Sequence, residues 1–142
     1  MNPVVVRKSE PNEMAQIIEL FKTVFVDTFF KSAPAFKDVT DGEQIYVALL
    51  DDNLIGFASI WEPDRFIHYL FVSPNARHKK VGSALIDRLA EIYGGPLFLK
   101  CLINNETGMA FYRSTGWKQI GNGNSDDGAY ALLSYNPCER KL

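Results

Sequence analysis

A short basic segment ahead of a predicted helix is the part of this chain whose residue types could bind an anion. Arg77, Lys79 and Lys80 supply positive charge, and a segment with helical spacing begins at Gly82 and Ser83. Free N–H groups at a helix start, together with the helix dipole, attract negative charge. Gly82 has no Cβ atom, so its backbone can approach a bulky ligand. The segment predicts a phosphate site, most naturally for a pyrophosphate; the alternative is a solvated basic turn.

The elements that must position this segment are a strand before it and a helix after it. Hydrophobic periodicity and turn residues divide the rest of the chain in the same way. The predicted order is a buried strand Val4–Val6, a helix from Pro11 to about Thr28, a short helix or irregular lid before the loop Asp38–Glu43, strands Ile45–Leu50, Leu54–Trp61 and Phe66–Val72, a helix Val81–Tyr93, strand Leu97–Leu102, a helix Glu106–Thr115, and strands Trp117–Ile120 and Ala129–Tyr135 around a loop Gly121–Gly128. This order predicts a mixed α/β fold with a mostly antiparallel central sheet of about seven strands and about four helices.

Length and composition limit the class of protein. The chain has 142 residues, 46% of them hydrophobic, with 15 basic and 17 acidic side chains and a net charge of −2. These values predict one folded domain over residues 1–142 and disfavour both disorder and general nucleic-acid binding. No run approaches the ~20 apolar residues of a membrane span, and the start does not resemble a secretory signal. Cys101 and Cys138 form neither a metal-ligand pattern nor a disulfide framework, so we expect a cytoplasmic protein without a metal site.

The segment Leu70–Leu85 resembles the acetyl-coenzyme A binding motif of the GNAT superfamily of N-acetyltransferases. That motif reads arginine or glutamine, two residues, glycine, one residue, then glycine or alanine, after a strand that ends in valine-x-proline. Arg77 and Gly82 match its first and last positions, whereas Lys80 replaces the middle glycine. The replacement requires a non-glycine residue to adopt the backbone conformation of the loop.

A second segment, Asn105–Trp117, resembles the family's asparagine, helix, phenylalanine-tyrosine and glycine-aromatic sequence. Gly108 stands where the family usually has alanine. The two motifs occur in the family's order, and the elements between and after them agree. The resemblance covers residues 45–135 and implies a GNAT-like fold in which two splayed strands receive the cofactor.

The resemblance implies acetyl-coenzyme A as co-substrate. Backbone groups at the end of the strand before the basic loop would hold the acetyl group and pantetheine, the loop would wrap the pyrophosphate, and a lysine would reach the ribose phosphate. Asn105 would bond the pantetheine amides, serve as a helix N-cap, or do both. The implied cofactor-binding residues are Leu70, Phe71, Val72, Arg77, His78, Lys79, Lys80, Val81, Gly82, Ser83, Asn105 and Tyr112.

The same resemblance suggests the residues that move protons. Tyr112 would act as general acid, because a phenol with a pKa near ~10 is protonated at neutral pH and can donate to the departing thiolate. His68 would accept the proton of the amine, on a strand face shared with Leu70 and Val72. The alternative for His68 is a backbone hydrogen bond within the sheet, and Glu62 and Asp64 are competing bases.

The acceptor is predicted to be a primary amine, in a small molecule or a protein, that attacks directly within a ternary complex. A covalent route through Cys101 is disfavoured, because a cysteine in a short apolar strand is usually a buried hydrophobe. Candidate apolar walls of the acceptor groove are Phe25, Phe29, Phe30, Phe36 and Trp61, and candidate rim charges are Asp38, Asp41, Glu43, Asp126 and Asp127. Ordinary core aromatics and solvated loops are the alternative. A non-catalytic acyl-coenzyme A sensing or partner-binding module is the second functional hypothesis, and a homodimer is possible.

Overall fold

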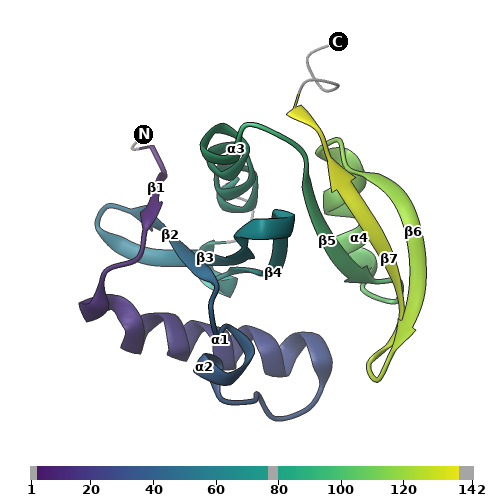
Figure 1. Ribbon diagram of the computed structural model, residues 1–142. Coiled ribbons are helices and arrows are strands. Elements are labelled where there is room, and N and C mark those ends of the chain that lie inside the picture. Colours follow the sequence, from purple (N-terminus) through teal and green to yellow (C-terminus); the bar gives the residue numbers. More distant parts are fainter. Residues whose placement is uncertain (1–2, 77–79, 138–142) are drawn as a thin grey trace.

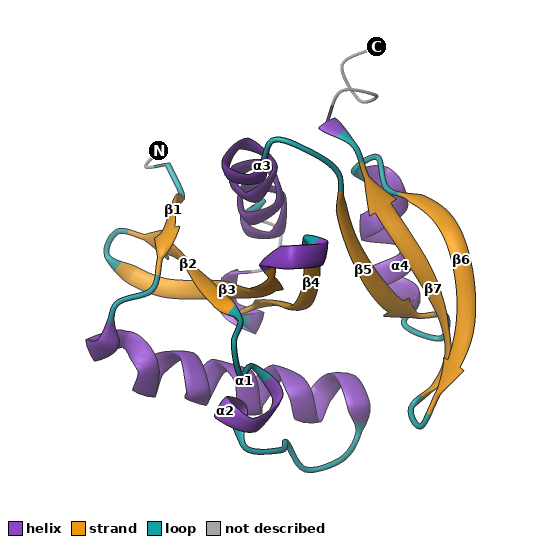
Figure 2. Ribbon diagram, viewed as in Figure 1, coloured by secondary structure: helices purple, strands orange, loops and turns teal. Residues whose placement is uncertain are grey.

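The computed structural model describes residues 3–76 and 80–137. One seven-stranded sheet, in the order β1-β2-β3-β4-β5-β7-β6, has helices on both faces (Figures 1 and 2). The elements are β1 (Val5–Lys8), a 3-10 turn (Pro11–Glu13), α1 (Met14–Phe29), α2 (Phe36–Val39), β2 (Gln44–Leu50), β3 (Asn53–Trp61), a 3-10 turn (Glu62–Asp64), β4 (Phe66–Val72), a 3-10 turn (Pro74–Ala76), α3 (Val81–Tyr93), β5 (Leu97–Leu102), α4 (Glu106–Ser114), β6 (Lys118–Ser125) and β7 (Gly128–Tyr135). The predicted mixed fold is confirmed.

Each face of the sheet has its own hydrophobic core. The first core lies between β2–β4 and the helices α1 and α2, and it is mainly aromatic. Phe21 is fully buried there and contacts the rings of Phe25, Phe36, Tyr69 and Phe71 at centroid distances of 5.0 to 5.9 Å. The second core packs α3 and α4 on the opposite face and reaches β5 and β7. Because α1 and α2 pack over the first strands only, the two cores cover different lengths of the sheet.

The sheet is continuous in its hydrogen-bonded order but narrow at one junction. β4 and β5 run parallel, and their ladder contains two residue pairs, Phe66 with Phe98 and Ile67 with Leu99. Beyond Ile67, the described residues of β4 pair with β3 only, and those of β5 pair with β7 only. The two strands therefore diverge after a single short contact, as the predicted splayed pair requires.

Two predicted elements differ from the structure at the sheet edges. The strand predicted as buried Val4–Val6 is β1, an edge strand in which Val5 is 51% exposed, because β1 pairs with β2 alone. Most of the loop predicted at Gly121–Gly128 is strand β6, which pairs along β7 and leaves a short turn. A Cβ atom on Gly123 would overlap the ring of Tyr130 across the strands. The glycine that suggested a loop instead makes room for a cross-strand tyrosine.

Two kinds of feature are absent from the described part of the chain. None of its helices is both long and apolar enough to cross a membrane. Within residues 3–76 and 80–137, histidine, cysteine, aspartate and glutamate side chains form no group of three that could hold a metal ion.

Candidate active site

The pairing of β4 with both of its neighbours changes at His68. Along β3 the register joins Ser59 to Tyr69 and then Ile60 to Ile67, so His68 is an extra residue that forms a β-bulge. Ile67 is also the last residue of β4 that pairs with β5. His68 thus stands at the vertex where β4 and β5 separate. Bulges commonly re-aim a side chain next to an active site.

The bulge changes which face His68 occupies. The sequence predicts that His68 shares a face with Leu70 and Val72, but this is wrong, because the bulge interrupts the two-residue alternation. Leu70 and Val72 pack against the core beneath α3. The His68 ring instead stacks on Tyr69 of the aromatic core, with centroids 4.5 Å apart, and its Nδ1 lies 3.1 Å from Oε2 of Glu43.

Glu43 is a nearly buried acid rather than a charge on an open rim. Its side chain is 9% exposed, while that of His68 is 43% exposed. The hydroxyl of Ser59, a fully buried residue of β3, donates to Oε1 of Glu43, and Oε2 faces His68. Sequence reasoning placed Glu43 in the acidic rim and missed this contact, since 25 residues separate Glu43 from His68 and no periodic pattern links them.

The end of β4 offers backbone rather than side chains to a ligand. Phe71 is 8% exposed and packs its ring against Phe21 and Phe57. Leu70 and Val72 are partly buried in the other core. Past the bulge, the edge of β4 that faces away from β3 has no strand partner in the described structure. Its N–H and C=O groups are thus available to pair with an extended ligand between the strands.

The start of α3 carries the described part of the predicted phosphate loop. Lys80 is the N-cap residue, with φ 61° and ψ 27°, a left-handed conformation that few non-glycine residues adopt. It therefore takes the conformation that glycine adopts easily. Val81, next in the chain, is 2% exposed and anchors the first turn in the core. Arg77, His78 and Lys79 lie outside the described residues.

Gly82 and Ser83 follow in the first turn of α3. A Cβ atom on Gly82 would lie 2.9 Å from Cζ of Phe111. The space that the sequence assigns to a ligand is thus occupied, on this side of the helix, by an aromatic ring of α4. Ser83 is partly exposed beside it. Gly82 consequently sets how closely α3 and α4 approach each other.

Asn105 caps α4, as predicted. Its Oδ1 accepts a hydrogen bond from the N–H of Gly108 at 3.1 Å. A Cβ atom on Gly108 would lie 2.6 Å from Nδ2 of Asn105 and 3.2 Å from Sγ of Cys101. Glycine at this position therefore allows the cap and the cysteine to sit against the helix. The pantetheine contact of Asn105 stays a prediction.

Tyr112, on α4, lies between two aromatic side chains. Its ring centroid is 5.2 Å from that of Phe111 and 5.5 Å from that of Trp117. Burial, with a smaller contribution from the nearby Cys101 thiol, raises the pKa of the Tyr112 hydroxyl well above its ordinary value. Burial also raises the pKa of Cys101, to about 11. Both groups are therefore protonated at neutral pH, so Tyr112 carries a proton and Cys101 is a poor nucleophile.

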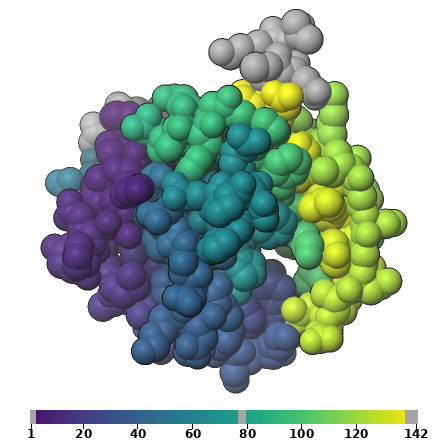
Figure 3. Space-filling view, viewed as in Figure 1, coloured from purple at the N-terminus to yellow at the C-terminus, as the bar shows by residue number. Residues whose placement is uncertain are grey.

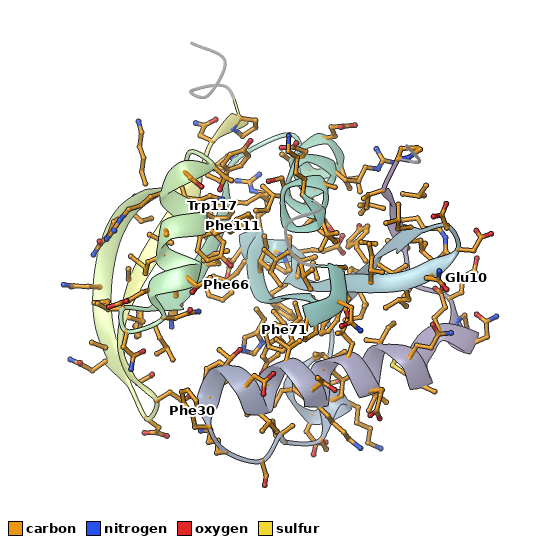
Figure 4. All side chains as sticks on the ribbon, turned by 180° about the vertical axis from the view of Figure 1, so that it is seen from behind. Glu10, Phe30, Phe66, Phe71, Phe111 and Trp117 are labelled. Atoms are coloured by element: carbon orange, nitrogen blue, oxygen red, sulfur yellow. The ribbon has the colours of Figure 1, made fainter. Side chains whose placement is uncertain are left out.

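The side of the sheet below the vertex is open. Figure 3 shows the surface hollowed between the hairpin β6–β7, coloured yellow to green, and the blue part of the chain near the end of α1. Figure 4 shows Phe30 at that end of α1, beside the hairpin, and Phe66 on the far side of the opening. Phe30 is 88% exposed and Trp61 is 41% exposed. Lys31 joins the two edges through an ion pair with Asp127, Nζ to Oδ1 2.6 Å.

Several predicted wall and base residues lie elsewhere. Phe25 and Phe36 are each 5% exposed and belong to the aromatic core, which agrees with the alternative of ordinary core aromatics rather than groove walls. Glu62 accepts a 2.7 Å hydrogen bond from Tyr93 on α3, on the face opposite α1. These three side chains therefore stabilise the fold. His68 is the predicted base that lies at the vertex.

The sequence matches the model of the acetyltransferase (GNAT) family over residues 13–117. The chain belongs to this family. The match spans α1 to the residue that precedes β6, so it includes the bulge, the divergent strands and the start of α3.

Individual relatives agree with this membership. An uncharacterized protein of Mycobacterium leprae is 29% identical over 84% of this chain, which spans only 36% of that longer protein. The peptidyl-lysine N-acetyltransferase YiaC of Escherichia coli is 28% identical, over 80% of this chain and 82% of YiaC. The crystal structure of the PaiA N-acetyltransferase of Thermoplasma acidophilum, in complex with coenzyme A, has a TM-score of 0.76 at 17% identity, covering 94% of this chain and 99% of PaiA. At that identity the last comparison shows a shared fold.

Proposed function

We propose that this acetyltransferase moves the acetyl group of acetyl-coenzyme A onto a primary amine by direct attack within a ternary complex. The observation that carries the proposal is the divergence of β4 and β5 at His68. Among the described residues, it leaves an edge of β4 without a strand partner from the vertex to Val72. An extended pantetheine arm pairs with that edge as a strand would. Its diphosphate then reaches the N-terminus of α3, where helix N–H groups bind anions.

The two proton carriers that we propose are His68 on β4 and Tyr112 on α4. His68 accepts the proton that the ammonium must lose, because a protonated amine has no lone pair. The amine nitrogen forms a bond to the acetyl carbon while backbone N–H groups of β4 polarise the carbonyl. The C–S bond then breaks, and Tyr112 gives its proton to the thiolate of coenzyme A. The second proton, which the nitrogen loses as the amide forms, restores the Tyr112 hydroxyl. Holding amine and thioester together supplies much of the acceleration.

The open side below the vertex is the route we propose for the acceptor. Asp126 and Asp127 lie at the turn between β6 and β7, with the exposed ring of Phe30 beside them. Negative charge and an apolar surface together suit a cationic amine on an aliphatic stem. The activity named for the relative YiaC makes a lysine-containing peptide the first acceptor to test, followed by small amines.

Two measurements test the proposal. Acetyl-coenzyme A should raise the melting temperature, because a ligand specific to the folded state stabilises it. Thiol release should then appear with at least one amine of a panel of peptides and small amines. No thermal shift at saturating acetyl-coenzyme A contradicts the cofactor site, while a shift with no thiol release from any amine supports the sensing module instead.

A Tyr112→Phe variant tests the general acid. The change keeps the ring between Phe111 and Trp117 but removes the proton donor, so turnover should fall by roughly 10²–10⁴-fold. The thermal shift with acetyl-coenzyme A should stay unchanged. Phe111→Leu is the matched control on the same helix; it changes packing without removing a proton donor. Turnover in Tyr112→Phe equal to that of the native enzyme would exclude the assignment.

A further inference from the structure

We propose that Glu43 is a positioning residue for His68: it fixes the tautomer and orientation of the imidazole and stabilises the imidazolium that forms when the amine loses its proton. This inference rests on the proposed function, since it assigns a role to a residue behind the proposed base. Glu43 would act through His68 and would not touch the substrate.

The hydrogen bonds of Glu43 use both of its oxygens. Ser59 donates to Oε1 from inside the sheet, and the Nδ1 of His68 lies 3.1 Å from Oε2. A carboxylate beside Nδ1 favours the tautomer in which Nδ1 carries the proton. Nε2 then has a free lone pair, which is what a base that faces the amine requires.

The ring of His68 is also held by its face. It stacks on Tyr69 at an interplanar angle of 22°, and Tyr69 is 9% exposed in the aromatic core. A hydrogen bond at Nδ1 and a stacking contact together restrict both the rotation and the tilt of the imidazole. His68 therefore has a defined orientation although its side chain is partly exposed.

The charged groups around the rings of His68 and Tyr69 come from three other segments of the chain. Glu43 precedes β2 and contacts the ring directly. Burial, together with the negative charges of Glu43 and of Asp127 in the β6–β7 turn, raises the pKa of Tyr69, which therefore stays neutral. Asp127 is itself paired with Lys31, between α1 and α2. In this set the carboxylate of Glu43 is the negative charge in contact with His68.

A purely structural role for Glu43 is the competing explanation, because its bond to Ser59 also ties the segment before β2 to the sheet. The two roles differ in what a Glu43→Gln change does. Glutamine can still accept the Ser59 hydrogen bond, so a structural role is largely preserved. It has no negative charge to stabilise an imidazolium, so a positioning role is lost.

The kinetic test compares Glu43→Gln with the native enzyme and with Glu91→Gln, the same change at an exposed carboxylate of α3 that pairs with Arg88. For Glu43→Gln we expect kcat/KM for the amine to fall about 10- to 100-fold and the acid limb of its pH profile to move. The thermal shift with acetyl-coenzyme A should be unchanged. Glu91→Gln should keep the native profile. A native pH profile in Glu43→Gln would overturn the proposal.

A double-mutant cycle separates positioning from independent effects. Because Glu43 acts through His68, adding Glu43→Gln to His68→Gln should lower kcat/KM by less than twofold further. Full additivity of the two losses would overturn the proposal. Should Glu43→Gln unfold, Glu43→Asp replaces it; the shorter side chain draws the carboxylate back from Nδ1, so the same acid limb should shift in the same direction by a smaller amount, and an unshifted limb counts against the proposal.

Imidazole nitrogen NMR gives a readout that does not depend on turnover. The chain has two histidines, so the spectrum contains two ring systems. In the native protein the His68 signals should show the tautomer protonated at Nδ1, and in Glu43→Gln they should show a mixture. Native protein that binds acetyl-coenzyme A but acetylates no amine would contradict the proposed function, whereas a His68 tautomer unaffected by Glu43→Gln would contradict the positioning role alone.

Discussion

The two halves of the sheet, β1–β4 and β5–β7, are built differently, although all seven strands form one hydrogen-bonded sheet. β1–β4 are covered on both faces, by α1 and α2 on one side and by α3 on the other. β5–β7 bury one face under α3 and α4, where Leu97, Leu99 and Cys101 are each at most 5% exposed. On the other face of β5, Phe98 and Leu102 are partly exposed and Lys100 is exposed. In the described structure, the half without a second helical layer therefore leaves this face of β5 without a helix over it.

The same difference separates the two residues that we propose as proton carriers. The covered half holds His68 rigidly through Glu43 and Tyr69, and the other half supplies Tyr112 from α4. The two halves share two residue pairs of β-ladder, and beyond these each strand keeps an unpaired edge. A ligand that inserts there replaces the missing sheet contacts.

The largest expected effect is in the aromatic core of the covered half. Phe21→Ala should lower the free energy of unfolding by about 3–5 kcal/mol, because it removes a fully buried ring that has four aromatic neighbours. Phe30→Ala, the same change at an 88% exposed position, should alter it by less than about 0.5 kcal/mol. Chemical denaturation measures both. Equal losses in the two variants would refute the contrast between core and surface phenylalanines.

A smaller effect should appear where α3 meets α4. In a helix interior, glycine to alanine ordinarily stabilises by about 1 kcal/mol. Gly82→Ala should instead destabilise by about 1–3 kcal/mol, because the new Cβ would lie 2.9 Å from the ring of Phe111. Adding Phe111→Leu should recover part of that loss in denaturant titrations. If Gly82→Ala is more stable than the native protein, then Phe111 does not lie as close to Gly82 as the structure shows.

The third effect depends on pH and belongs to the half that contains β5. The pKa of Cys101 is raised from 9.0 to about 11 by burial, so the folded protein binds the thiol proton more tightly than the unfolded chain. The stability that depends on this proton is complete below pH 9 and is lost as the pH rises toward 11. The loss amounts to about 1.4 kcal/mol at pH 10. Cys101→Ala should therefore lose less stability than the native protein between pH 8 and pH 10. If the free energies of unfolding of the two proteins fall in parallel over this pH range, the Cys101 thiol is not buried.

The smallest effect is expected at the ion pair that joins the two halves at the open side. Asp127→Asn removes the partner of Lys31 and should cost less than about 1 kcal/mol, because both side chains are partly exposed. The cost should shrink further in high salt. The exposed pair of Arg88 and Glu91 on α3 gives a matched control through Glu91→Gln. A loss above about 2 kcal/mol at Asp127 would mean that this pair holds the halves together.

Local sequence patterns predicted the elements with strong periodicity. The strands Phe66–Val72 and Leu97–Leu102 and the helix Val81–Tyr93 have the predicted bounds, since apolar alternation or helical spacing runs through each and a turn residue ends it. The edge strands β1 and β6 were predicted less well. Their residues meet one neighbouring strand only, so their pattern is weak.

The sequence by itself determined the family, the order of the elements and the two motifs, because these depend on residue types at fixed spacing along the chain. The tertiary structure alone decided that His68 sits in a bulge beside Glu43, that Phe111 fills the space next to Gly82, and that Phe25 and Phe36 are core residues. Each of these facts joins residues that are distant in sequence or depends on the register between strands. Such contacts arise only when separate elements pack together, and no local pattern encodes them.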